Sequence, residues 1–513
     1  MSHSRTINPA LPDLSGTPAR ALAAAVVAAS AMAATLGGVP VIVAVALLLC
    51  LSAAVLATIA RPALVLAAFI VLLPFHLLLM VLFFNGGLDH GLLRVFSVWK
   101  ELAALIVLSV LATRHLVGGK MPRIRPVDVV VLVFLAWNLL YLVAPIGSPF
   151  RPPMAMRVQG LRDNVFFVFL YFIGRLAPMS VRDVRLVLSS ALGVGLLGAV
   201  VGMAERFLVP IDFFFDPLNL DGFMREYLNL YYYTGLPFNF WTSVGNVRRA
   251  VSFHLGSHHF AASFLLVMPL VLGLRRPLRT FPRSLRLPLL CLAAVGLALP
   301  LTRSVVLACF LQILLLGVLD KRPHWVLSAG AAVALILGSS LVFLDLGGYF
   351  SSVTRVEPGS SVYSHAASWS DTSEIVRNYP MGVGFGVEDT AAERSQGANR
   401  APRTPEGEYA FTMITVGLPG LLLFVALQLS VAVTLLNRYR RATDPAMRNL
   451  AMVTLVMVAG YVVTGSFTQV RHVPALMYPL WWLVGTVVAG KLTDEGHRPG
   501  AATPSAERRS PRT

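Results

Sequence analysis

Runs of about 20 apolar residues recur along almost the whole chain, the length of helix that crosses a bilayer's hydrocarbon core, and they constrain the fold more than any other feature. By this length criterion the sequence predicts about 14 spans, near residues 20–37, 39–59, 62–83, 95–113, 127–146, 162–178, 184–205, 258–274, 284–301, 304–319, 324–345, 408–436, 447–466 and 474–490. Charged residues are only 13% of the 513, too few to cover a soluble protein of this size. The chain is therefore predicted to be an all-α polytopic integral membrane protein.

The net charge of +17 comes from arginines and lysines that concentrate in alternate loops. Examples are Arg61, the group from Arg114 to Arg125, the group from Arg275 to Arg286, and the group from Arg438 to Arg448. An excess of basic residues in alternate loops is the positive-inside pattern, which orients helices in the membrane. The charge therefore gives no indication of nucleic-acid binding, and both termini are predicted to be cytoplasmic.

This orientation divides the chain into seven predicted parts. They are an N-terminal segment 1–19, transmembrane helices 20–205, an outer loop 206–257, transmembrane helices 258–345, a large outer loop 346–407, transmembrane helices 408–490, and a tail 491–513. The tail is rich in Pro, Ala, Ser, Glu and Arg, a composition that cannot bury enough apolar surface to fold, and it is predicted to be disordered.

Several arginines fall on the predicted outer side, where the insertion bias does not account for them. Arg249 precedes a span, Arg303 stands in a tight turn between two spans, and Arg471 with His472 precedes the last span. A guanidinium stays charged and binds phosphate oxygens through two parallel hydrogen bonds, so several of them at one face would form an anion site. The alternative is that each lies at the membrane interface or pairs with a loop carboxylate.

Five motifs follow one another on this predicted outer side. They are RAVSFHLGSHHFAA (residues 249–262), LTRS (301–304), His365 ahead of Trp369, NYPMGVGFG (378–386), and PEGEY (405–409) ahead of GLPG (417–420). In this order, over roughly residues 150 to 430, the chain resembles the O-antigen ligase and polymerase superfamily. The family's loop usually ends in His-Asn-x-Tyr, eleven residues before the glycine of GLxG, and here Glu406 stands at the place of that histidine.

The resemblance implies a fold like that of the C-type glycosyltransferases, in a bacterial inner membrane with periplasmic outer loops. It implies an undecaprenyl-pyrophosphate-linked glycan as donor and a glycan or a lipid as acceptor. Such a reaction needs cations to hold the pyrophosphate and a base to take the proton of the acceptor hydroxyl. We expect Arg249 and Arg303 to hold the pyrophosphate and Glu406 to be the base.

Four further residues complete the predicted site. Glu408 is the alternative base, and His365, Arg471 and His472 are expected to contact substrate. The predicted outer loops hold no DxD motif or paired carboxylates for a metal, so we expect a metal-independent enzyme without a cofactor. Polymerase, ligase to a lipid core, and protein oligosaccharyltransferase remain open.

Two other classes of protein fit parts of the pattern. A flippase for lipid-linked oligosaccharide, or another transporter, would explain the many spans and the outer arginines. It should also carry ionisable residues within its spans, whereas the predicted spans hold few beyond Lys100 and Glu101. A purely structural membrane protein would have no need of the polar, glycine-turned loop 346–407.

Overall fold

The computed structural model describes residues 61–119, 122–144, 146, 148, 150–230, 236–237, 240–241, 247–321, 361–387 and 406–492, excluding the side chains of 361–366. All regular elements in these ranges are helices, and an isolated bridge joins Trp241 to Arg248. The all-α prediction is therefore confirmed for the described part of the chain. The predicted spans 20–37, 39–59 and 324–345, and the tail 493–513, lie outside the described residues.

Most helices of the N-terminal half overlap the predicted apolar runs. The helices of this half are α3 (Pro62–Leu72), α4 (His76–Asn85), α5 (His90–Ser97), α6 (Trp99–Val117), α7 (Pro126–Val143), α8 (Met154–Val165), α9 (Phe167–Leu176) and α10 (Val181–Leu208). Of these, α5 and α8 lie mostly before the runs 95–113 and 162–178. A single 3-10 turn, Leu73–Phe75, joins α3 to α4, and a bend of 41° separates α5 from α6. Short helical turns follow α10, among them α11 (Leu220–Gly222).

In the C-terminal half the helices again overlap the predicted apolar runs, with one exception. The helices of this half are α12 (Ser257–Gly273), α13 (Arg286–Ala298), α14 (Arg303–Leu319), α17 (Ser361–Asn378), α19 (Glu408–Arg441), α20 (Pro445–Gly465) and α21 (Pro474–Ala489). The exception is α17, which lies within the predicted outer loop 346–407. Within the described ranges, five helical stretches are long and apolar enough to cross a membrane, or six if the bent pair α5 and α6 counts as one span. This finding supports a membrane protein, while the total of about 14 spans stays a prediction.

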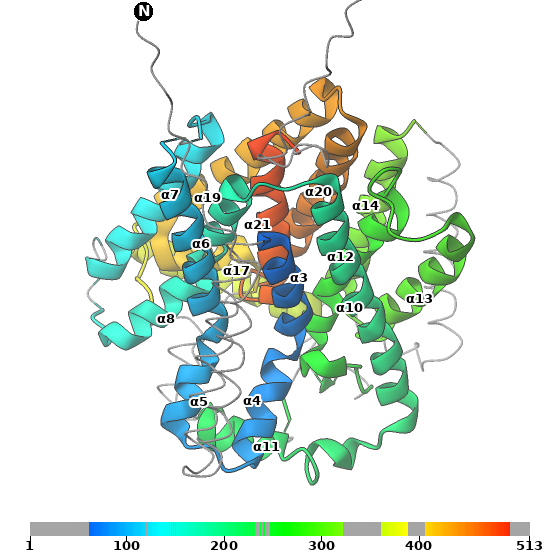
Figure 1. Cartoon of the computed structure of the whole chain (residues 1–513). Coiled ribbons are helices and arrows are strands. Elements are labelled where there is room, and N and C mark those ends of the chain that lie inside the picture. The colour runs from blue at the N-terminus through cyan, green and yellow to red at the C-terminus, as the bar shows by residue number, and fades with distance from the viewer. Residues whose placement is uncertain are drawn as a thin grey trace, which may run out of the picture.

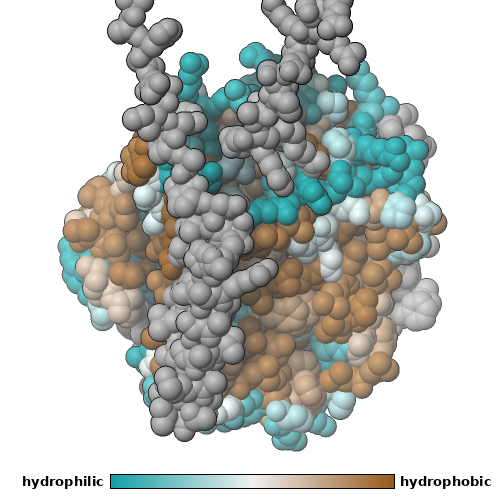
Figure 2. All heavy atoms as spheres, viewed as in Figure 1, coloured by the Kyte–Doolittle hydropathy of each residue, from teal (hydrophilic) through white to brown (hydrophobic). Residues whose placement is uncertain are grey.

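Helix α21 lies in the middle of the bundle, with α3, α12 and α20 near it (Figure 1). It packs against α9 almost backbone to backbone, because a Cβ on Gly174 would lie 2.1 Å from the carbonyl oxygen of Trp482, and one on Gly485 equally close to that of Tyr171. Close contact through small residues is a common way for helices to associate within membranes. On the face seen in Figure 2, hydrophobic residues cover the middle of the bundle, and hydrophilic residues gather mainly at its upper end and in smaller areas at its lower end.

Helix α19 is broken at Gly417, whose φ of 75° and ψ of −179° are not helical. The segment 380–386 docks into this break: Val383 N donates to Ile414 O at 2.8 Å, Gly384 N to Thr415 O at 2.9 Å, and Leu418 N to Pro380 O at 2.9 Å. These bonds satisfy backbone groups that the break frees from the helix, as a low-polarity environment requires. The GVGFG and GLPG motifs thus form one interlocked unit, which we call the glycine turn.

Helix α7 supports the glycine turn from the other side. Trp137 Nε1 donates to Val416 O at 3.0 Å, the hydroxyl of Tyr141 donates to Met381 O, and Phe385 is buried against Tyr141. The turn therefore fixes how the first half of α19, which begins at Glu408, enters the bundle.

Candidate functional site

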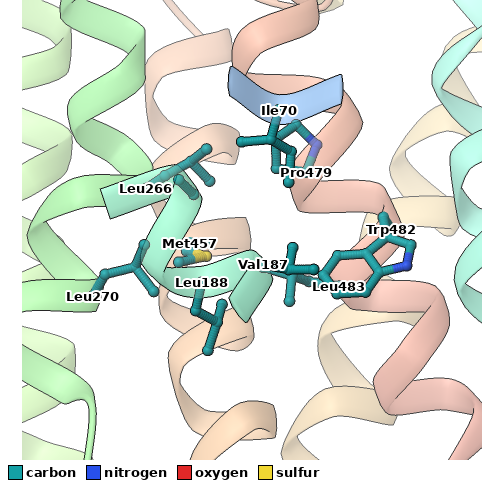
Figure 3. A pocket seen from close by; sticks show the side chains of 10 residues that line it. Ile70, Val187, Leu188, Leu266, Leu270, Met457, Pro479, Trp482 and Leu483 are labelled. Atoms are coloured by element: carbon teal, nitrogen blue, oxygen red, sulfur yellow. The ribbon is translucent and has the colours of Figure 1, made fainter. Parts of the chain in front are cut away.

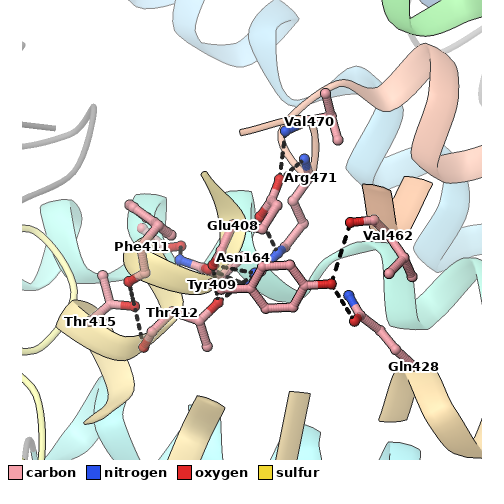
Figure 4. Close-up of polar contacts among 11 residues, drawn as sticks. Asn164, Glu408, Tyr409, Phe411, Thr412, Thr415, Gln428, Val462, Val470 and Arg471 are labelled. Carbon is pink, nitrogen blue, oxygen red and sulfur yellow. Dashed lines mark hydrogen bonds and ion pairs between the residues drawn. The ribbon is translucent and has the colours of Figure 1, made fainter. Parts of the chain in front are cut away.

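Glu408, the first residue of α19, is almost completely buried and paired with Arg471 (Figure 4). Arg471 Nε lies 2.9 Å from Glu408 Oε2, and both side chains are at most 3% exposed. Glu408 Oε1 accepts hydrogen bonds from the backbone N–H of Val470, at 2.5 Å, and from that of Arg471. The carboxylate therefore fixes the short loop between α20 and α21, residues 466–473, which we call the 470 loop.

Arg471 extends this arrangement to α8. Its Nη1 donates to Asn164 Oδ1 at 2.8 Å, and its Nη2 donates to Thr412 Oγ1 at 2.5 Å. The guanidinium carbon also lies 4.0 Å from the centre of the Phe424 ring, a cation–π contact. The edge of the guanidinium is hydrogen-bonded and its face lies against an aromatic ring, so Arg471 joins α8, α19 and the 470 loop. These contacts suit a residue that holds the three segments in position.

Glu406 lies just outside this buried pair and is half-buried. Its backbone N–H donates to Ser368 Oγ on α17 at 2.8 Å. Gly407 between the two carboxylates has a φ of 97°, and a Cβ there would lie 2.9 Å from Ser466 O. The left-handed backbone at 407 therefore turns the chain sharply against the 470 loop and separates Glu406 from the buried Glu408.

Arg249 is held against the turn that precedes α14. Its Nε donates to Pro300 O and its Nη2 to Thr302 Oγ1, both at 2.7 Å, and the residue is 9% exposed. Arg303 follows Thr302 directly, begins α14, and is half-buried. The next residue, Ser304, shares a 3.1 Å hydroxyl contact with Thr468 of the 470 loop. The structure thus brings Arg249, Arg303 and the 470 loop together.

Histidines add to this region from the start of α12. The rings of His259 and His472 lie 5.5 Å apart in an edge-to-face arrangement. His258 lies within electrostatic range of Arg249, His259 and His472. The histidines of the SHH stretch and the predicted contact His472 therefore face the same region as the two arginines.

Sequence reasoning missed one member of this region, His76 on α4. Trp99 Nε1 donates to His76 Nδ1 at 3.0 Å, and His76 Nε2 lies 3.1 Å from Lys100 Nζ. His76 is also within electrostatic range of His259. The signal in the sequence was Lys100, a charge within an apolar run, which requires polar partners when it is buried.

Lys100 belongs to a chain of charges that ends on α8, the helix that also contacts Arg471. Its Nζ lies 3.3 Å from Glu101 Oε1, which in turn lies 3.6 Å from Arg162 Nε. Arg162 is on α8, two residues before Asn164, the partner of Arg471. The predicted arginines and this polar chain together form a cation-rich interior that converges on the 470 loop.

The remaining predictions of site residues have simpler outcomes. His365 lies on α17, but its side chain is outside the described residues. Within the described ranges, no group of three or more His, Cys, Asp or Glu could hold a metal ion.

A cavity between α3, α10, α12 and α21, lined by Ile70, Leu188, Leu266, Trp482 and other apolar residues, is unsuited to a charged substrate (Figure 3).

Comparison with known proteins addresses the identity of this region. No curated protein matches the chain. Residues 288–425 match the family model described as O-antigen ligase. The matched range includes Arg303, Glu406, Glu408 and the whole glycine turn, whereas Arg249 and the 470 loop lie outside it. The match supports the O-antigen ligase and polymerase superfamily, which the motifs of the sequence predicted, over residues 288–425.

Proposed function

We propose that this protein is a membrane glycosyltransferase that polymerises or ligates glycan units carried on undecaprenyl pyrophosphate. The family match supports a ligase or polymerase type of activity in glycan biosynthesis. The observation that carries the finer proposal is the convergence of Arg249, Arg303 and the 470 loop at the start of α19. The acceptor would be a second glycan or a lipid.

In this proposal the reaction occurs at the periplasmic face of a bacterial inner membrane. Loops 206–257 and 346–407 would be periplasmic and both termini cytoplasmic, as the alternation of basic loops favours. Helix α19 would then begin near the periplasmic side with Glu408, just after Glu406, and end inside with Arg438, Arg440 and Arg441.

Each candidate residue has a chemical role in the proposed transfer. The acceptor hydroxyl oxygen bonds to the anomeric carbon of the donor sugar, and its proton passes to the carboxylate of Glu406. The bond between the anomeric carbon and the pyrophosphate oxygen breaks, and its electron pair remains on that oxygen. Arg249 and Arg303 stabilise the developing charge through charge-assisted hydrogen bonds.

The half-buried position of Glu406 suits a base that must meet an incoming hydroxyl. Glu408 would have to give up its ion pair with Arg471 before it could act as the base. We therefore assign Glu408 and Arg471 to positioning, with Glu408 kept as the alternative base. His365 and His472 would contact the substrate.

Conservative substitution of the two arginines tests the proposal. Lysine keeps the charge of arginine but cannot reproduce its planar fork, so Arg249→Lys and Arg303→Lys should each lower transfer by purified protein about 100-fold. Arg185→Lys is the matched control. Arg185 also donates to a backbone carbonyl, that of Pro277, but it is exposed and is not one of the proposed site residues. Wild-type rates in both active-site variants would refute the assignment.

The same assay addresses the metal. Because arginines supply the positive charge in this proposal, transfer in EDTA should proceed at the untreated rate. A rate that is lost in EDTA and restored by Mg²⁺ would show that loop carboxylates hold an ion.

One observation favours a second function, the transport of lipid-linked oligosaccharide. Lys100 and Glu101 are buried between apolar helices, and buried ionisable residues often mark a transport path. A flippase would move the lipid-linked glycan across a vesicle membrane without forming a new glycosidic bond. Transport of that kind, with no transfer product, would replace the enzyme proposal.

A further inference from the structure

Helix α17 has two faces of different character. Thr372 is buried, and Ser368 accepts the backbone N–H of Glu406, so this face packs toward the start of α19. Along the other side a row of residues is exposed: Trp369, Ser370, Ser373, Glu374 and Arg377. Their spacing of one, four, five and eight positions places them on one side of a helix. We call this row the α17 stripe.

Trp369 is unusual within the stripe because it is a large aromatic residue that is 43% exposed. It is the one exposed large hydrophobic residue among the described side chains of 367–387. Helix α19 shows what a surface suited to lipid looks like, since its exposed Leu422, Leu429 and Val433 present apolar groups only. The ring of Trp369 instead stands among hydroxyl, carboxylate and guanidinium groups, which lipid chains would not solvate.

A surface of this mixed kind suits a ligand that has apolar C–H faces and many hydroxyl groups. We propose that the α17 stripe is a carbohydrate-binding subsite, in which a pyranose ring stacks on Trp369. This inference rests on the proposed function and deepens it, because it assigns a place to the glycan rather than to its pyrophosphate.

The chemistry of the two partners is complementary. The face of an indole ring carries partial negative charge, which attracts the weakly positive C–H groups on one face of a sugar ring. Sugar hydroxyls can donate to Glu374 and accept from Arg377, and hydrogen bonds to ionised groups are the stronger kind. A tryptophan also loses little conformational freedom on binding, since it has two side-chain torsions.

The position of the stripe ties it to the reaction. Trp369 follows Ser368, the residue that holds the backbone of the proposed base Glu406. From Trp369 to Arg377 the helix rises by about 12 Å, which leaves room for more than one sugar ring. A glycan bound there would extend away from Glu406, as a growing or incoming chain must.

Saturation-transfer NMR tests the subsite without requiring transfer. The probe is the oligosaccharide that mild acid releases from the host's own lipid-linked intermediates, added to the full-length protein in nanodiscs. The wild-type protein should transfer saturation to sugar ring C–H protons, and Trp369→Ala should reduce the signal at least fivefold, in line with the loss of one stacking contact. Trp369→Phe keeps an aromatic face and should retain most of it.

Phe213→Ala is the matched control, because Phe213 is 41% exposed and lies in a different segment. It should bind the oligosaccharide as the wild-type protein does. An unchanged signal in Trp369→Ala, an equal loss in Phe213→Ala, or the absence of any signal in the wild-type protein would each overturn the subsite.

Transfer kinetics separate this inference from the proposed function. Trp369→Ala should raise KM for the glycan substrate at least tenfold and change kcat little, because stacking is made in the ground state and in the transition state alike. A lower kcat at unchanged KM would also overturn the subsite. If the arginine variants transfer normally while Trp369→Ala loses sugar binding, the pyrophosphate assignment fails and the subsite stands.

Discussion

Two carboxylates separated by one glycine have very different surroundings in this protein. Glu408 is buried, ion-paired with Arg471 and bonded to two backbone N–H groups, whereas Glu406 is half-buried beside α17. The sequence favours Glu406 as the base because it stands eleven residues before Gly417, the place of the family's histidine. Their difference in burial could not be predicted, because it arises from the 470 loop, more than 60 positions away along the chain.

Substitution of each carboxylate by its amide should therefore have different consequences. Glu408→Gln leaves the buried guanidinium of Arg471 without a counter-charge, which should destabilise the protein by about 3–5 kcal/mol. Glu406→Gln should abolish transfer, because an amide cannot take the proton of the acceptor hydroxyl, and it should cost less stability than Glu408→Gln because Glu406 is only half-buried.

Thermal melting and membrane abundance measure the first effect. Accumulation of untransferred lipid-linked glycan measures the second. A stable Glu408→Gln protein that transfers no glycan, beside a fully active Glu406→Gln protein, would exchange the roles of the two residues.

His76 illustrates another limit of reading residues from the sequence. Lys100 is conspicuous there as a charge within an apolar run, but its partner lies 24 positions earlier and resembles any histidine at a helix end. Pairing between helices depends on how they rotate about their axes. Hydropathy leaves that rotation undetermined when a helix is apolar on every side.

At the scale of elements, the glycine turn explains why two motifs 30 residues apart both contain glycine. A Cβ on Gly417 would lie 2.3 Å from the backbone carbon of Met381, and its φ of 75° is unfavourable for other residues. We expect Gly417→Ala to destabilise the protein by about 2–5 kcal/mol, measured by thermal melting in detergent.

Gly193→Ala is the control for this prediction. Gly193 lies within helix α10, and a Cβ there would meet nothing within 4 Å. Alanine is the better helix former, so this change should be neutral or stabilise the protein by about 0.5–1 kcal/mol. Equal melting temperatures for the two variants would mean that the turn does not constrain α19.

The apolar runs predicted the positions of the described long helices but not their breaks. The run 162–178 is divided between α8 and α9, and the run 95–113 begins at the bend between α5 and α6. The hydropathy of a run indicates how long its helix is and which residues lie within the membrane. A change of direction depends on a few backbone torsions, such as the φ of −101° and ψ of 8° at Val98, and such torsions have little effect on composition.

At the scale of the whole molecule, orientation in the membrane can be tested directly. Because basic residues fill the loops assigned to the inside, a reporter fused after Lys491 should behave as cytoplasmic. A reporter inserted near position 397, outside the described residues, should behave as periplasmic. The activities of alkaline phosphatase and a cytoplasmic fluorescent protein at each position measure this, and the same side for both would overturn the site.

The backbone contact between α9 and α21 has a consequence for the order of assembly. Helix α21 is synthesised after every other described helix, yet it occupies the middle of the bundle and meets Gly174 through Gly485. The helices that are inserted earlier must therefore leave the central position free until α21 has been synthesised. Arg471 lies three positions before the first residue of α21 and pairs with Asn164, 307 positions earlier, so this bond can form only near the end of biogenesis. We therefore expect a nascent chain of this protein to carry out no glycan transfer until its last described helix is in place.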